Sequence, residues 1–152
     1  MCPTEANCSQ PPESLGILLS LVKSELVRAL EQELAISGVG LRFNQVQALK
    51  RLQVQGPQGA GELARSMGYD NGAMTRLLDQ LEEKGYLKRK PDPQDRRALR
   101  IELTPRGKSQ ARQIAGCSER VLDAAQRALN ASEREHLIDY LQRVLVTLRE
   151  PN

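Results

Sequence analysis

Two short amphipathic helices followed directly by two alternating strands restrict the folds open to this chain more than any other pattern in it. The helices are expected over residues 60–67 and 71–84, where apolar residues recur three and four positions apart. The strands are expected over residues 86–90 and 99–103, where apolar and polar residues alternate. A helix pair with a short turn is a helix-turn-helix, and two strands joined by a polar loop form a β-hairpin, or wing. The expected fold class is mainly α with a two-stranded β wing, a winged helix-turn-helix.

Capping residues mark the ends of these elements. Gly68 is expected in the turn of the helix pair, and Asp70 or Asn71 is expected to cap the second helix. Thr104 followed by Pro105 is typical of the start of another helix after the second strand.

The segment before the helix pair is expected to hold one more short helix and a turn. Asn44 with Gln47 predicts a capping pair at the start of that helix. The glycines and the proline of residues 56–59 predict a turn after it.

Longer helices with broad apolar faces flank this centre. One begins at Ser14 and ends in the glycines before residue 41, and another is expected from residue 105 to about residue 129. A capping box of Ser132 and Glu135 predicts the start of the last helix. These flanking helices are more apolar than the middle ones, and packing in a homodimer explains this better than a monomer does.

Basic residues are concentrated in one part of the chain. The segment from Lys84 to Arg112 holds ten basic and three acidic residues, a net charge of +7, whereas the rest of the chain carries −4. A basic block in an otherwise acidic protein indicates a polyanionic partner, with nucleic acid ahead of an anionic protein or membrane surface. Aromatic residues make up only 3% of the chain, which counts against RNA recognition by stacking and against an aromatic-lined carbohydrate groove.

The second helix of the pair offers side chains suited to DNA bases. Asn71 can pair with adenine, Arg76 with guanine, and Thr75 lies beside them on the expected exposed face. The small residues Gly72 and Ala73 let the start of the helix approach the floor of the major groove. The alternative is an ordinary solvated helix face.

The loop of the wing carries arginines that fit the minor groove. Arg96 or Arg97 could enter this narrow, electronegative groove, and Arg97 is the favoured one. Asp95 is expected to orient an arginine through a charge-assisted bond. The alternative is a mobile charged loop. Phosphate contacts, which add affinity without reading sequence, are expected from the basic residues of the strands: Lys88, Arg89, Lys90 and Arg100.

Several functional classes are disfavoured by composition and motifs. His136 is the single histidine, so sites that need two imidazoles are excluded, and we expect no metal and no cofactor. The chain has no dinucleotide-binding or phosphate-binding glycine loop and no catalytic triad, so we expect no enzyme. The longest apolar run, Leu15 to Val22, is far shorter than the ~20 residues of a membrane span, so we expect a cytoplasmic protein with no membrane partner.

The three cysteines, Cys2, Cys8 and Cys117, are an odd number without metal-binding spacing. They are expected to be reduced thiols without function. The alternative is redox sensing, because the two thiols of the N-terminal segment could reach Cys117 or a partner subunit.

The central segment resembles the MarR family of bacterial transcriptional regulators, and the match covers about residues 41–110. The most specific part is an Asp-Arg-Arg wing tip followed, after a strand, by Leu-Thr-x-x-Gly. The matching motifs are Gly61-Glu62-Leu63-Ala64, Met74 to Leu87, Asp92-Pro93-Gln94-Asp95-Arg96-Arg97 and Leu103-Thr104-Pro105-Arg106-Gly107.

The resemblance implies a homodimer that binds palindromic operators, usually as a repressor released by a small ligand or by oxidation. It places ligands between the dimerisation helices and the DNA-binding lobe, near Phe43, where a small anionic or aromatic effector is expected. Two alternatives stay open, a repressor that senses oxidation through Cys8 and Cys117 and a winged-helix module that binds another protein. The expected organisation is a disordered tail (1–13), a dimerisation helix (14–40), a winged helix-turn-helix DNA-binding lobe (41–104) and C-terminal dimerisation helices (105–150).

Overall fold

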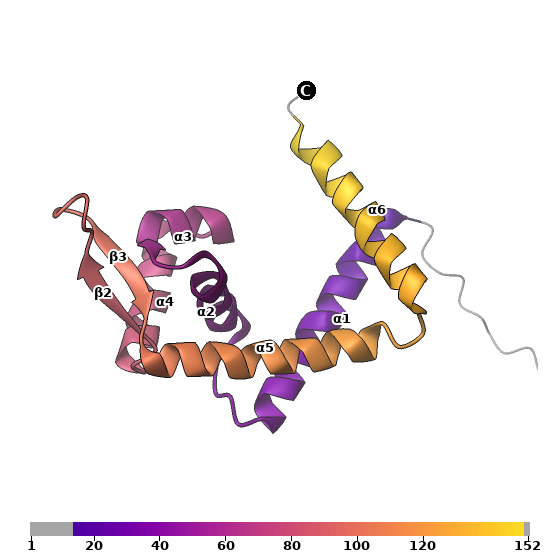
Figure 1. The fold of residues 1–152 in the computed structure, drawn as a ribbon, viewed down its shortest axis with the longest axis horizontal. Coiled ribbons are helices and arrows are strands. Elements are labelled where there is room, and N and C mark those ends of the chain that lie inside the picture. Colours follow the sequence, from indigo (N-terminus) through magenta and orange to yellow (C-terminus); the bar gives the residue numbers. More distant parts are fainter. Residues whose placement is uncertain (1–13, 151–152) are drawn as a thin grey trace, which may run out of the picture.

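The computed structural model describes residues 14–150, which fold into six helices and three short strands. One end of the molecule is a lobe built from the short helices and the sheet, and the long helix α5 leads away from it to α1 and α6 (Figure 1). The elements are α1 (Leu15–Ile36), α2 (Phe43–Gln55), β1 (Gln58–Gly59), α3 (Ala60–Met67), α4 (Asn71–Glu83), β2 (Leu87–Pro91), β3 (Leu99–Leu103), α5 (Pro105–Ala125) and α6 (Ala131–Arg149).

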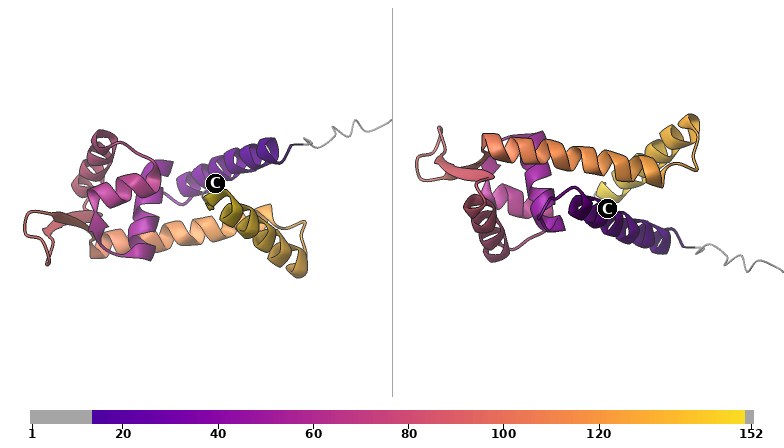
Figure 2. Two further views of the ribbon diagram at one scale, coloured as in Figure 1. Left: turned by 90° about the horizontal axis from the view of Figure 1, so that it is seen from above. Right: turned by 90° about the horizontal axis from the view of Figure 1, so that it is seen from below.

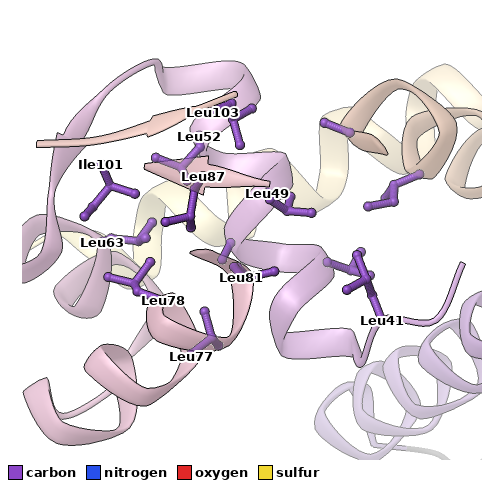
Figure 3. Packing of buried hydrophobic residues seen from close by; sticks show 14 of the residues in the cluster. Leu41, Leu49, Leu52, Leu63, Leu77, Leu78, Leu81, Leu87, Ile101 and Leu103 are labelled. Atoms are coloured by element: carbon purple, nitrogen blue, oxygen red, sulfur yellow. The ribbon is translucent and has the colours of Figure 1, made fainter. Parts of the chain in front are cut away.

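The lobe is held together by aliphatic side chains that its helices and sheet direct inward. Leu49 of α2, Leu63 of α3, Leu78 of α4 and Ile101 of β3 are fully or almost fully buried and lie in one cluster (Figure 3). Met74 is also buried, so the side of α4 that carries it belongs to the core. Burying a leucine or isoleucine side chain stabilises a fold by about 1.5–3 kcal/mol, so this cluster fixes α4 against the rest of the lobe.

The wing is an antiparallel hairpin, as the alternation predicts. Strand β2 pairs with β3 from Leu87 opposite Leu103 to Pro91 opposite Leu99. One expectation is wrong: Gln58 is not in a turn but in β1, opposite Ile101 of β3, so the sheet has three strands in the order β1-β3-β2. Two residues are too few to show an alternating pattern, so the sequence predicted only the glycine-proline turn.

Most helix ends in the lobe follow the sequence. Asp70 caps α4, because its Oδ1 accepts a hydrogen bond from the backbone N–H of Ala73 at 2.8 Å. Thr104 caps α5 in the same way, with Gly107 N–H donating to its Oγ1 at 3.0 Å. Gly68 ends α3 with φ +69°, a left-handed conformation that glycine adopts at little cost.

The expected start of α2 is wrong by two residues, and the expected end of α5 is wrong by about four. Helix α2 begins at Phe43, and the carbonyl of the Gln45 side chain accepts from the N–H of Arg42 at 3.2 Å, so Asn44 and Gln47 do not form the predicted capping pair. Helix α5 ends at Ala125 instead of about residue 129.

The capping box of α6 lies two residues before the predicted one. Asn130 Oδ1 accepts from Glu133 N–H at 3.0 Å, and Glu133 Oε2 accepts from Asn130 N–H at 2.8 Å. The chain contains two overlapping capping patterns here, because Ser132 and Glu135 have the same spacing. Asparagine is one of the strongest N-capping residues, and its box opens the helix.

The flanking helices extend from the lobe with much of their apolar surface exposed. Helix α1 packs against α5 near its C-terminal end, where Leu30 and Leu34 are buried, and Arg120 of α5 pairs with Glu33 of α1 at 2.7 Å. The first half of α1 and the whole of α6 spread apart from each other and from α5 (Figure 2). Helix α6 buries none of its residues. None of the helices between residues 14 and 150 is long and apolar enough to cross a membrane.

Candidate nucleic-acid interface

Helix α4 presents a polar face opposite its buried one. Asn71, Gly72, Thr75 and Arg76 are exposed and Ala73 is half-buried, as expected for a helix whose start faces outward. The Thr75 hydroxyl donates to the carbonyl oxygen of Asn71 at 2.8 Å, so its oxygen is left with acceptor capacity only. This face therefore combines one side-chain amide, a guanidinium and one hydroxyl acceptor at the start of a capped helix.

The wing tip is a folded loop that directs two arginines outward. Asp92 Oδ1 accepts from Gln94 N–H at 2.8 Å, and the loop closes with Asp92 N–H donating to the carbonyl of Ala98 at 2.9 Å. Arg96 and Arg97 are both exposed.

Asp95 organises the wing tip differently from the prediction. Its Oδ1 accepts from the backbone N–H of Arg97 at 3.0 Å, and within residues 14–150 its carboxylate forms no ion pair with a guanidinium. Asp95 therefore fixes the backbone under Arg97 and leaves the arginine side chain free to turn outward. The sequence indicates that Asp95 bonds a neighbouring arginine, but it does not distinguish the backbone N–H of that arginine from its guanidinium.

Two lysines of the wing share one carboxylate. Lys90 of β2 lies 3.1 Å and Lys88 lies 3.9 Å from the carboxylate of Glu102 across the hairpin. The hydrogen bond and charge of Glu102 raise the pKa of Lys90 above its ordinary value. Two ammonium groups against one carboxylate leave this side of the wing with net positive charge.

Arg89 and Arg100, both predicted to contact phosphate, bond within the protein. Arg89 of β2 pairs with Asp79 of α4 at 2.7 Å and also with Glu82 of the same helix. Arg100 donates to the carbonyl oxygen of Pro57 at 2.7 Å. Arg89 thus joins the wing to α4 and Arg100 joins β3 to the turn before β1. The sequence gives no sign of either contact, because the partners are distant or lie on another element.

Cys117 is the one cysteine among residues 14–150, and it is fully buried on α5. Its thiol lies 3.4 Å from Ser37 Oγ and from Arg120 Nη2, where α1 crosses α5. Cys2 and Cys8 lie outside the described residues.

A cavity of about 430 Å³ opens between α1, α2 and α5, in the region where the sequence predicts an effector. Its walls are mainly aliphatic and include Phe43, with two ammonium groups, those of Lys23 and Lys50, at the lining. Lys50 Nζ also donates to Ser118 Oγ at 3.3 Å. An apolar cavity with two cations suits a small apolar anion.

Comparisons with known proteins identify the family. The profile of the MarR family matches residues 41–99. The multiple antibiotic resistance protein MarR of Salmonella typhimurium is 34% identical over 93 residues, which are 61% of this chain. The chain spans 63% of the length of that curated relative. The reduced form of MarR from E. coli superposes with a TM-score of 0.73 at 30% identity, covering 87% of this chain and 96% of that one. This chain belongs to the MarR family.

The MarR fold accounts for the winged helix-turn-helix that the residue pattern predicts. A mutant MarR from E. coli, solved in complex with operator DNA, has a TM-score of 0.74 and 29% identity over 86% of this chain and 93% of that one. The expected family and fold class are confirmed by these comparisons together with the structure.

Proposed function

We propose that this protein is a homodimeric DNA-binding transcriptional regulator that represses from a palindromic operator and is released by a small ligand. The observation that carries the proposal is the pairing of a capped helix, α4, whose exposed face bears Asn71, Thr75 and Arg76, with a wing whose tip exposes Arg96 and Arg97. The E. coli relative solved with operator DNA has the same fold, which supports DNA as the partner.

In this proposal the start of α4 enters the major groove. Asn71 would bond adenine and Arg76 would bond guanine, because their side chains match the donor and acceptor pattern of those bases. Gly72 and the half-buried Ala73 allow the helix backbone to come close to the bases. The Asp70 cap and the apolar underside of α4 hold this surface rigid, so little ordering is needed on binding.

The wing would lie along the minor groove next to the helix. Arg97, with Arg96 as the second candidate, would insert into the groove where it is narrow and electronegative. Asp95 would act by fixing the backbone beneath Arg97. Lys88 and Lys90 would contact phosphates, and Arg89 and Arg100 would support the surface from within.

Two copies are proposed to associate through α1, α5 and α6. A cavity of about 630 Å³ lies between α1 and α5, and α6 leaves a row of aliphatic side chains exposed. Exposed apolar surface of this extent is typical of an interface. A two-fold axis would set the two α4 helices about one DNA turn, ~34 Å, apart, which matches a palindromic site.

The proposed effector is a small apolar anion, aromatic or aliphatic, in the cavity formed by α1, α2 and α5. Its position between the flanking helices and the lobe means that a bound ligand can change the separation of the two recognition helices and hence the affinity for DNA. The burial of Cys117 favours this signal over thiol oxidation, because a buried thiol is a slow reactant.

The test replaces Arg76 by alanine and measures binding to a site selected from genomic fragments and to versions of it with single base changes. We expect about a tenfold or greater loss for the selected site and weaker discrimination at one base pair, the ~1–3 kcal/mol of one bidentate contact. Gln53→Ala is the control, because Gln53 is exposed on α2 and lies outside α4, the wing and the proposed dimer interface, and this change should leave binding unchanged. Unaltered discrimination in Arg76→Ala would contradict the assignment.

A further inference from the structure

We propose that Gln45 is a positioning residue for the recognition helix α4, and that its hydrogen bond to Gln80 carries displacement of α2 at the ligand cavity to the DNA-binding surface. The inference rests on the proposed function, and it names the residues through which that regulation would act.

The buried side chain of Gln45 connects α4 to the linker that precedes α2. Only 5% of the residue is exposed. Its Nε2 donates to Gln80 Oε1 of α4 at 2.9 Å, and its Oε1 accepts from the N–H of Arg42, in the linker between α1 and α2, at 3.2 Å. One side chain therefore joins the chain that arrives from α1 to the helix that faces DNA.

Hydrogen-bond chemistry fixes the orientation of this amide. A backbone N–H can only donate, so the atom of Gln45 that faces Arg42 must be the carbonyl oxygen. The amide nitrogen then faces α4 and requires an acceptor there, which Gln80 Oε1 supplies. The link is directional, whereas the aliphatic contacts of α2 and α4 around it are not. Among residues 14–150, no other side-chain hydrogen bond connects α2 and α4.

The same helix forms a wall of the ligand cavity on its other side. Phe43, Gln47 and Lys50 line the cavity and follow the spacing of one helix face. Gln45 lies two residues from the first of them, near the opposite face, where it contacts α4. Because a helix moves as a rigid rod, a ligand that shifts Phe43 also shifts Gln45.

The acceptor on α4 lies close to the base-contacting residues. Gln80 follows Arg76 by four residues, which places the two side chains one turn apart along the same side of α4. Gln80 is exposed although its amide is bonded, so its loss removes the link without opening a cavity in the core.

The experiment compares Gln80→Ala and Gln45→Met with wild type in binding to the selected operator and to random duplex DNA. Gln45→Met keeps the length of the side chain and removes both its donor toward Gln80 and its acceptor for Arg42 N–H. We expect each variant to bind the operator about fivefold more weakly, the effect of one net hydrogen bond, and to bind random DNA as wild type does. Hydrogen exchange of the α4 amides should rise in both. Gln53→Ala, an exposed glutamine of α2, is the control.

A double-mutant cycle tests the link itself. The double variant Gln45→Met/Gln80→Ala should bind the operator about as weakly as the single variants do, because both changes remove the same hydrogen bond. Equal losses on operator and random DNA, or wild-type behaviour of Gln80→Ala, would overturn the inference. If Gln45→Met fails to fold, Gln80→Ala alone decides. Failure of the wild-type protein to bind DNA would instead contradict the proposed function.

Discussion

Gly107 of α5 and the carbonyl oxygen of Tyr86 lie so close together that a Cβ atom on the glycine would be 1.8 Å from that oxygen. The contact belongs to a tight junction, where Thr104 N–H donates to the same carbonyl at 3.1 Å and the Thr104 hydroxyl donates to Gly85 O at 2.6 Å. The junction joins the end of α4, the first strand of the wing and the start of α5. It explains physically why a glycine stands three residues after this threonine.

Replacing Gly107 by alanine should destabilise the protein, because the backbone of α5 or of Tyr86 must move to admit the methyl group. We expect a loss of about 2–4 kcal/mol in the free energy of unfolding, measured by urea denaturation. Gly116→Ala is the matched control on the same helix, where the nearest obstacle is the flexible end of Arg120. That change should be neutral or stabilising by up to about 1 kcal/mol. Equal effects would refute the steric argument.

Arg89 and Lys90 are neighbours on β2, yet their loss should affect DNA binding differently. Lys90→Ala removes an exposed cation and should reduce the slope of log affinity against log salt by roughly one. Arg89→Ala breaks the pairs with Asp79 and Glu82, so affinity should fall while the slope is unchanged. Titrations at several salt concentrations separate the two. A reduced slope of log affinity against log salt for Arg89→Ala would show that Arg89 contacts phosphate.

The flanking helices should make the protein dimeric. Sedimentation at micromolar concentration should give twice the 16.9 kDa chain mass. Leu18→Glu combined with Leu141→Glu should raise the dissociation constant at least about a hundredfold, because unpaired carboxylates would be buried in the interface. Val54→Glu is the control, since Val54 is also apolar and exposed but lies on α2 in the lobe. A wild-type species of 16.9 kDa would contradict the interface.

An aromatic carboxylate should bind the cavity of α1, α2 and α5. Benzoate at millimolar concentration should raise the thermal midpoint of wild type by a few degrees, because the ligand binds the native state. It should also weaken binding to DNA, because the proposed ligand changes the separation of the two recognition helices. Lys23→Met with Lys50→Met keeps the aliphatic stems but removes both cations, and the stabilisation should disappear. Lys84→Met, outside the cavity, should respond as wild type does. Stabilisation that survives the first pair would place the ligand elsewhere.

The order and type of the elements in the lobe follow from the sequence because each carries a local signal. Leu63 in α3 and Leu77 and Leu78 in α4 belong to rows of apolar residues with helical spacing. Around Leu87 apolar and polar residues alternate, as they do in a strand. Strand β1 lacks such a signal, because its pairing with β3 is supplied by distant residues. The overlapping capping patterns at Asn130 and Ser132 show the same limit, since local preference alone does not choose between them.

Part of the candidate site could also be predicted from the sequence, and part could not. Exposure of Asn71, Thr75 and Arg76 follows from the helical period, once Met74 is assigned to the core. The roles of Arg89 and Gln45 do not, because each depends on which carboxylate or amide the fold brings within reach. A charged or amide side chain can bond DNA or the protein, and its spacing along the chain does not distinguish them.

The most direct test of the account is the affinity of the wild-type dimer for a palindromic site selected from genomic fragments, measured beside a random duplex at a series of salt concentrations. We predict at least a thousandfold preference for the selected site and a steep fall of both affinities with salt, as expected when several phosphates are contacted. Affinity without preference, or no salt-dependent binding to DNA, would contradict the assignment of α4 and the wing as a sequence-reading surface.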